Sequence, residues 1–283
     1  MLERLSAFLH RGPYAAAVRV ALLGLAAVVI CAPLSYFFSW VWFALIPIII
    51  AGLLFVSIVL LNRSRAKLDD TSALIGLEFA LRRLDWAPPD FYTDGAAGSP
   101  SLQLFHVKVL TLVKPQSILE LGSGQTTKLI SAYVGATSGA YALSIEQSPE
   151  WHGMLRSAIG HNYEVAPLVT RKIEGVDVLS YDVQLKGPRK FDYVLVDGPD
   201  NNVEGWRYTP FSRAGIVDEL PDVLADSFIV VFDDAERAGE RQTIELFARK
   251  LAAKGTPFRR FTLIGIKHQA VFVSPSLAFL QSV

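Results

Sequence analysis

The distribution of apolar positions divides the chain into two unlike parts. Between Val20 and Asn62 the sequence contains no Asp, Glu, Lys or Arg. As a helix this run would measure about 64 Å, roughly twice the hydrocarbon thickness of a bilayer. Two spans of about 20 residues fit that length better than one. We therefore expect a transmembrane helical hairpin over residues 1–61, with spans near 15–34 and 40–61.

The charges on either side of this apolar run predict its orientation. Pro33 and Ser35 allow the chain to turn between the two spans. Basic residues stand outside the hairpin and none stands in the turn: Arg4, Arg11, Arg63, Arg65 and Lys67. The positive-inside rule then places both termini and the rest of the chain in the cytoplasm, on the inner (plasma) membrane. A cleaved signal peptide and a buried helical hairpin are the alternatives, and the second apolar stretch argues against the first of them.

Beyond the anchor the pattern becomes that of an α/β protein. Helical spacing continues from Asn62 until Pro88 and Pro89 end it, which predicts a connecting helix and linker over 62–95. From 96 to 283 strands and helices alternate. The expected strands are SILEL, AYALSIE, VAPLVTRKI, FDYVLVDG and SFIVVFDD, followed by RRFTLIGIKH and QAVFVSP as an antiparallel pair. This alternation predicts a doubly wound, mostly parallel sheet with helices on both faces.

Acidic side chains stand at the ends of four predicted strands. Glu120 ends the first and Glu146 the second, Asp197 follows the fourth, and Asp233 and Asp234 follow the fifth. Sheets of this kind bind ligands at the carboxyl ends of their strands. We therefore expect one site along this rim.

The loop after the first strand, GSGQTT, favours a particular kind of ligand. Gly122 and Gly124 permit a tight turn and a close approach of the backbone, and the helix from about Thr126 directs its free N–H groups at the site. A dinucleotide-binding loop would read GxGxxG. The third glycine is missing, and Glu120 stands two residues before the first, where a carboxylate suits a cationic group. An NAD-dependent oxidoreductase is accordingly disfavoured.

The second predicted strand indicates that the ligand contains a ribose. Glu146 lies at the end of YALSIE, where a carboxylate can accept both ribose hydroxyls. A ligand with a ribose and a cationic part, and no required phosphate, describes S-adenosylmethionine (SAM). LELGSGQTT, SIEQSPEW, FDYVLVDGPD and FIVVFDDAER together resemble the Rossmann-like class I SAM-dependent methyltransferases, over roughly Ser99 to Pro275.

This resemblance implies a fold and a set of roles. The sheet would have the order 3-2-1-4-5-7-6 with the last strand antiparallel, and the segment from Asp94 to Leu104 would close over the cofactor. Glu146 would hold the ribose, Gln147 would lie beside the adenine, and Glu174 and Asp177 are further candidates for an adenine contact. The cofactor-binding set is Glu120, Gly122, Ser123, Gly124, Thr126, Glu146 and Gln147. The catalytic set, facing the methyl group or the acceptor, is Asp197, Asp233 and Asp234.

A metal site is an alternative use of the three aspartates. Asp197, Asp233 and Asp234 offer the hard oxygen ligands that divalent cations take. Metal-dependent relatives of the catechol type typically show Asp-Asn where this chain has Asp-Asp, so a divalent metal is the less favoured use of these residues. The histidines at 106, 152 and 161 are interpreted as surface or packing residues because they fall on predicted helices or just after one.

Composition narrows the function classes. The chain has 283 residues, 51% of them hydrophobic, and zero formal net charge, so charge suggests no nucleic-acid partner. A single cysteine, Cys31, excludes an internal disulfide and zinc sites built on cysteine pairs.

These features lead to one interpretation with two alternatives. We expect a membrane-anchored SAM-dependent methyltransferase, an O-methyltransferase for a lipid, glycan or other small acceptor at the cytoplasmic face. An aminopropyltransferase of the spermidine synthase type shares the fold, but VDGPDNN matches its diamine site only in part. The remaining alternative is a non-catalytic, membrane-tethered scaffold with a vestigial SAM site.

Overall fold

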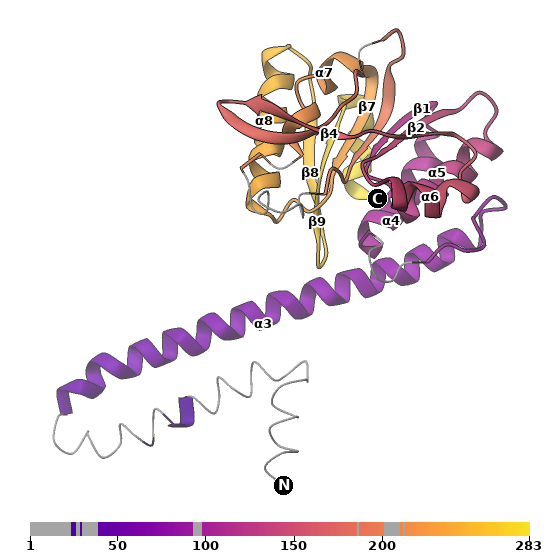
Figure 1. Cartoon of the computed structure of the whole chain (residues 1–283). Coiled ribbons are helices and arrows are strands. Elements are labelled where there is room, and N and C mark those ends of the chain that lie inside the picture. The colour runs from indigo at the N-terminus through magenta and orange to yellow at the C-terminus, as the bar shows by residue number, and fades with distance from the viewer. Residues whose placement is uncertain are drawn as a thin grey trace. The chain divides into compact units, whose positions relative to one another are not determined.

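A computed structural model gives the structure of the chain (Figure 1). It describes residues 24–26, 29, 39–92, 98–185, 187–200, 210–211 and 213–283. Packing divides the chain into two compact units, Met1–Leu68 and Asp69–Val283.

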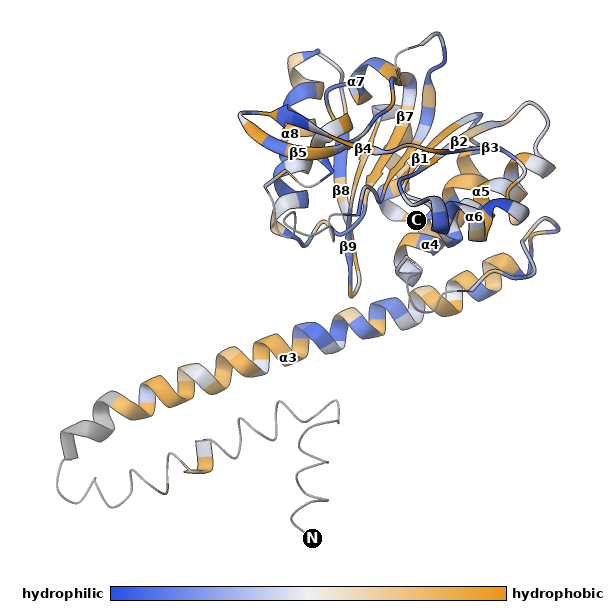
Figure 2. Ribbon diagram, in the orientation of Figure 1, coloured by the Kyte–Doolittle hydropathy of each residue, from blue (hydrophilic) through white to orange (hydrophobic). Residues whose placement is uncertain are grey.

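Helix α3 (Ser39–Leu81) unites two elements that the sequence analysis separated. The second predicted span and the start of the predicted connecting helix are one unbroken helix, and Figure 2 shows its apolar first half giving way to a hydrophilic stretch. Within the described residues it is the one helix long and apolar enough to cross a membrane, over Leu45–Leu81. The predicted first span and the turn at Pro33 lie almost wholly outside the described residues.

The end of α3 comes earlier than predicted. The helix stops at Leu81 rather than at Pro88. After it, the Arg83 N–H donates to the Ala80 carbonyl (3.1 Å) and the Leu84 N–H to the Leu81 carbonyl (3.0 Å). Bonds over three residues tighten the last turn and end the α-helical ladder.

The second unit is built on a seven-stranded sheet, as predicted. Its order is β3-β2-β1-β6-β7-β9-β8. The strands are β1 (Ser117–Leu121), β2 (Tyr141–Glu146), β3 (Asn162–Val165), β6 (Phe191–Val196), β7 (Leu224–Phe232), β8 (Arg259–Ile264) and β9 (His268–Val273). Pairing is parallel from β3 to β7, and β9 runs antiparallel to both β7 and β8.

The strand labels do not read 3-2-1-4-5-7-6 because a hairpin is inserted in the chain between the third and fourth strands of the large sheet. Strands β4 (Leu168–Ile173) and β5 (Val176–Tyr181) form a separate two-stranded antiparallel sheet. Within the large sheet alone, the strands stand third, second, first, fourth, fifth, seventh and sixth along the chain.

The prediction that VAPLVTRKI forms the third strand of the large sheet is wrong. The edge strand of the large sheet is β3, and most of VAPLVTRKI forms β4 of the hairpin. Pro167 separates the two strands. It has no N–H to donate, so the β3 ladder cannot continue through it.

Alternate residues of the central strands pack into two cores. Leu119, Val194 and Val230 face a core shared with α8 (Ala238–Ala253) and the β4–β5 hairpin. Their neighbours one position away face the other core, with α4 (Pro100–Lys108), the π-helical turn η1 (Val109–Val113) and α5 (Gln125–Ala136). Figure 1 shows α8 on one side of the sheet and α4 and α5 on the other. Burial on both faces explains why the central strands read as nearly continuous apolar runs.

The remaining helices are short. They are α6 (Pro149–Leu155), η2 (Arg156–Ala158), η3 (Ala214–Ile216), α7 (Leu220–Val223) and η4 (Pro275–Ser282). Between β6 and β7 the described residues form the short helices η3 and α7. Pro221 stands at the start of α7, where a proline begins a helix.

The α8 core depends on aromatic packing around Phe272, which is fully buried. Its ring centroid lies 5.0 Å from that of Phe247 and 5.4 Å from that of Phe258. We expect Phe272→Ala to lower the free energy of unfolding by about 3–5 kcal/mol, because it removes buried contacts and leaves a cavity. Urea unfolding of the full chain in detergent measures this. Phe279→Ala is the control, since Phe279 is 48% exposed. An equal loss in both variants would contradict the packing described here.

Candidate functional site

The carboxyl ends of the parallel strands form one rim, and acidic residues gather there. Glu120 is the penultimate residue of β1 and lies beside Ser144 of the adjacent strand β2, and Glu146 is the last residue of β2. Both glutamates occupy alternating positions in register with Ile118 and Ala142, which face the α4 and α5 layer. The two side chains therefore leave the sheet on the same face.

Glu120 is enclosed by hydroxyl groups and has no exposed surface. Its carboxylate accepts hydrogen bonds from Thr126 Oγ1 (2.5 Å) and Ser144 Oγ (2.6 Å), and Ser144 Oγ also contacts His161 Nε2 (2.8 Å). Burial raises the pKa of Glu120 to about 7, against the lowering effect of these bonds. Neutral donors do not offset the loss of hydration as a cation would.

Gly122 is required by a close approach of two backbone segments. Its φ of +88° lies in the left-handed region, and a Cβ there would lie 2.7 Å from the backbone nitrogen of Gly198. A Cβ on Gly198 would in turn lie 2.1 Å from the Tyr181 hydroxyl. The loop after β1 thus packs directly on the loop after β6, which no larger residue permits.

The space around Gly124 is open, in contrast to that around Gly122. A Cβ there would meet no heavy atom within 4 Å, so there is open space before the first turn of α5. The Gly124 N–H donates to Thr127 Oγ1 (2.8 Å). The start of α5 is therefore the part of the loop that can accept a ligand close to the backbone.

Glu146 braces two loops through hydrogen bonds to both of its oxygens. Oε2 accepts from the N–H (3.0 Å) and hydroxyl (2.6 Å) of Ser123, and Oε1 accepts from the N–H groups of Gln147 (2.8 Å) and Ser148 (2.9 Å). The Gln147 side chain bonds the backbone of Asp200, donating to its carbonyl and accepting from its N–H. The ribose and adenine roles of these two residues remain predictions.

Ser123 lies at the centre of this part of the rim. Its hydroxyl is 2.8 Å from the Tyr163 hydroxyl, and its carbonyl accepts from Trp151 Nε1 (2.9 Å). Burial raises the pKa of Tyr163 to about 12, so the tyrosine stays protonated. Tyr163 lies outside the strand-end motifs, and SIEQSPEW, which ends at Trp151, does not by itself indicate what the tryptophan contacts.

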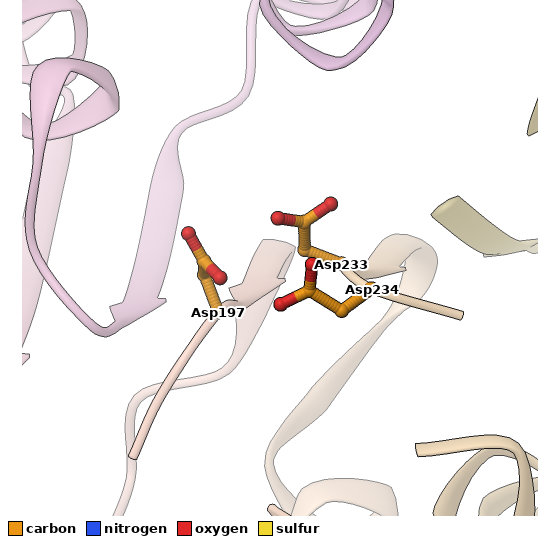
Figure 3. Close-up of side chains that lie close together, drawn as sticks. All are labelled: Asp197, Asp233 and Asp234. Carbon is orange, nitrogen blue, oxygen red and sulfur yellow. The ribbon is translucent and has the colours of Figure 1, made fainter. Parts of the chain in front are cut away.

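The three aspartates after β6 and β7 form a second cluster (Figure 3). Asp197, Asp233 and Asp234 each offer a carboxylate oxygen within 4.8 Å of the others. Asp233 and Asp234 are buried, whereas the Asp197 side chain is 35% exposed. Asp234 has a φ of +56°, a left-handed conformation that Asp tolerates better than most residues.

Cations that the sequence analysis missed surround this cluster. Arg213 Nη2 lies 2.8 Å from Asp234 Oδ2 and 3.2 Å from Asp197 Oδ1. Lys267 Nζ lies 3.2 Å from Asp234 Oδ1 and 3.5 Å from Asp233 Oδ2, and Arg237 Nη1 lies 2.9 Å from Asp234 Oδ2. Arg213 and Lys267 belong to no sequence motif. Arg237 is the last residue of FIVVFDDAER, but the motif does not show that it pairs with Asp234.

The charges set the pKa values within the aspartate cluster. Burial and the negative charge of Asp233 raise the pKa of Asp197 to about 7, although Arg213 acts in the opposite direction. Burial also acts to raise the pKa of Asp234, but Arg213, Lys267 and Arg237 outweigh it and the pKa is lowered. At neutral pH Asp234 is ionised, and Asp197 is the carboxylate that can exchange a proton.

Two hydrogen-bonded residues hold the cluster in position. Asp70 of α3 accepts from the Ile266 N–H (2.8 Å) and so fixes the turn that carries Lys267. Gln269 Nε2 donates to Asp233 Oδ1 (2.7 Å) and to Ser99 Oγ (3.1 Å). Asp70 is 196 positions from Ile266 in the chain, and its role became apparent only in the folded protein.

The remaining residues that the sequence singled out lie outside the two acidic groups of the rim. Glu174 and Asp177 belong to the β4–β5 hairpin and do not directly follow β3. Glu174 pairs with Arg249 of α8 (2.8 Å) and Asp177 with Lys172 (3.9 Å). His106 is a buried packing residue, as expected: its Nδ1 lies 2.8 Å from the Tyr193 hydroxyl, and burial lowers its pKa to about 3. Residues 94–97, the start of the segment expected to close over a cofactor, lie outside the described residues.

Comparison with known proteins gives only distant structural likenesses. No protein family model and no curated protein matches the chain. An O-methyltransferase from Bacillus cereus in complex with SAH is 15% identical over 70% of this chain and 90% of its own, with a TM-score of 0.43. The O-methyltransferase TomG from Streptomyces achromogenes, involved in tomaymycin synthesis and bound to SAM, is 17% identical over 75% and 99%, also at 0.43. The SAH-bound Podospora anserina methyltransferase PaMTH1 is 17% identical over 71% and 86%, at 0.40. With these TM-scores the similarities add no weight to a functional assignment.

The raised pKa of Glu120 predicts a pH-dependent cost to stability. Between about pH 4.5 and 7 the folded protein holds a proton that the unfolded chain has lost, so stability from this group falls as pH rises. We expect the unfolding free energy of the wild type minus that of Glu120→Gln to fall by roughly 2–3 kcal/mol between about pH 5 and pH 8. Urea unfolding of the full chain measures it, with exposed Glu164→Gln as the control. A difference that stays flat with pH would contradict the raised pKa.

Proposed function

We propose that this chain is a membrane-anchored SAM-dependent methyltransferase that acts on a lipid, glycan or other small acceptor at the cytoplasmic face. The observation that carries this proposal is the single rim where Glu120, Glu146 and Asp197 meet the glycine turn and the start of α5. That rim combines carboxylates, free helix N–H groups and a partly exposed acid. The distant likenesses to solved structures carry none of the argument.

The residues at the rim fit the proposed cofactor. The open space at Gly124 and the first N–H groups of α5 suit the carboxylate of the amino-acid part. Glu146 suits the ribose, with the Ser123 hydroxyl now at the place that a ribose hydroxyl would take. Because Glu120 has no exposed surface, its role in this proposal is to hold the start of α5 through Thr126 rather than to touch the ligand.

The membrane anchor in this proposal rests on α3. Its apolar stretch is long enough to cross a bilayer, and the exposed basic residues Arg63, Arg65 and Lys67 follow that stretch directly. Basic residues at this place favour the cytoplasmic side. Tethering would raise the local concentration of acceptors carried by the membrane.

Bound SAM supplies a methyl group on a positively charged sulfur, already activated for transfer. The protein must then orient the acceptor and remove its proton if the acceptor is a hydroxyl. Asp197 suits that task because its side chain is partly exposed and its pKa lies near 7. Within the described residues, Arg213 contacts Oδ1 of Asp197, which leaves Oδ2 to accept the proton.

The ribose assignment predicts a specific loss of cofactor affinity. We expect Glu146→Gln to weaken SAM binding by about 10-fold or more, because an uncharged amide replaces a charged acceptor. Isothermal titration of the full chain in detergent with SAM, and separately with decarboxylated SAM, measures both affinity and cofactor preference.

Glu164→Gln, an exposed change on the neighbouring strand β3, is the control and should bind SAM as the wild type does. Thermal unfolding of each variant separates lost binding from lost folding. No SAM binding by the folded wild type would refute the cofactor assignment, and preference for decarboxylated SAM would favour aminopropyl transfer.

The base assignment predicts a pH profile. Asp197 accepts a proton only when ionised, so we expect methyl transfer to rise with pH through about 7 and then level off. Asp197→Asn should lower kcat by about 10²- to 10⁴-fold with SAM affinity retained. The assay follows labelled methyl groups from SAM into lipid and glycan extracts of cells that lack the gene.

Asp218→Asn is the matched control, because Asp218 is an exposed carboxylate that pairs with Lys250 outside the aspartate cluster. Its rate and pH profile should match the wild type. Unchanged turnover in Asp197→Asn would remove Asp197 from the reaction.

A further inference from the structure

The three aspartates after β6 and β7 have the donor set of a divalent metal site, but cationic side chains already occupy the cluster. Arg213 Nη2 lies within 3.2 Å of both Asp197 and Asp234, and its Nη1 donates to the Asp233 carbonyl (3.1 Å). Arg213 enters between the ends of β6 and β7. Its side chain is only 7% exposed, so it is a built-in part of the cluster rather than a surface partner.

The individual oxygens leave little room for a metal. Both oxygens of Asp234 lie within 3.2 Å of cationic nitrogens. Asp233 Oδ1 accepts from Gln269 (2.7 Å), and its Oδ2 faces Lys267 at 3.5 Å. Within the described residues, Oδ2 of Asp197 is the carboxylate oxygen of this cluster without such a partner. A divalent ion needs several oxygens at about 2.0–2.6 Å and would have to displace Arg213 or Lys267.

The balance of charges in the cluster also argues against a bound metal ion. The three carboxylates are matched by the three cations paired with them: Arg213, Lys267 and Arg237. Although burial opposes it, the charges of Asp197, Asp234 and Asp233 raise the pKa of Arg213, so the guanidinium stays charged. Among the described residues, Glu240 is a further acid at the edge of this group, 3.8 Å from Arg237. A second cation would enter a site that is already compensated.

We infer that Arg213, supported by Lys267, is the resident cation of this cluster and closes it to divalent metal ions. Arg213 is thereby a positioning residue: it fixes Asp197 Oδ1 and, among the described residues, leaves Oδ2 without a cationic partner. This inference concerns the cluster itself and does not require that the chain be a methyltransferase. If the proposed function also holds, its reaction is independent of divalent metal.

Direct binding of Mn²⁺ to the full chain in detergent tests this inference, with electron paramagnetic resonance reporting the free ion. We expect no stoichiometric binding to the wild type at concentrations up to about 1 mM, the weak end for protein sites of this kind. Arg213→Met should bind one Mn²⁺ at least 10-fold more tightly than the wild type, and Asp233→Asn in the same chain should abolish that gain.

Arg260→Met is the control, since Arg260 pairs with Glu245 away from the cluster, and it should gain nothing. Should Arg213→Met fail to fold, Lys267→Met gives the same test from a more exposed position. Stoichiometric Mn²⁺ binding by the wild type that Asp233→Asn removes would overturn the inference. So would a folded Arg213→Met chain that binds no Mn²⁺. Neither result depends on whether the protein binds SAM.

Discussion

The parallel pairing of β2, β1, β6 and β7 is the constraint on which the site depends. It brings the carboxyl ends of four strands to one edge, where residues far apart in the chain become neighbours. The close approach of Gly122 and Gly198 then locks two of the strand-end loops together. Because neither position has room for a side chain, the distance between these two loops is set by backbone contact alone.

The acids on this rim are held in two chemically different ways. Glu120 is surrounded by hydroxyl donors, and burial raises its pKa to about 7. The aspartates after β6 and β7 are instead held by buried and half-buried cations, above all Arg213. The first arrangement gives a rigid brace for the start of α5. The second lowers the pKa of Asp234 and leaves Asp197, with a pKa of about 7, as a group that can exchange a proton near neutral pH.

The rim and the apolar helix address separate parts of the proposed function. The polar contacts around Gly124 and Glu146 concern the cofactor, whereas the apolar stretch of α3 concerns where acceptors are found. Asp70 is the link within the second unit between the end of α3 and the turn before Lys267. Through that hydrogen bond, the helix contributes directly to the position of a cation in the aspartate cluster.

The sequence by itself determined the α/β class, the apolar stretch of α3 and the strand-end acids, because each follows from local periodicity and from parallel strands ending at one edge. It mislocated the edge strand, since only Ala166 and Pro167 separate β3 from the hairpin strand β4. Only the tertiary structure decided what surrounds the acids. Arg213, Lys267 and Asp70 belong to no motif, and they reach the rim through contacts between segments distant in the chain. The local sequence pattern indicates on which face of a strand or helix a residue lies. The burial of an acidic side chain and the charges of its partners determine its pKa, and both are properties of the folded chain.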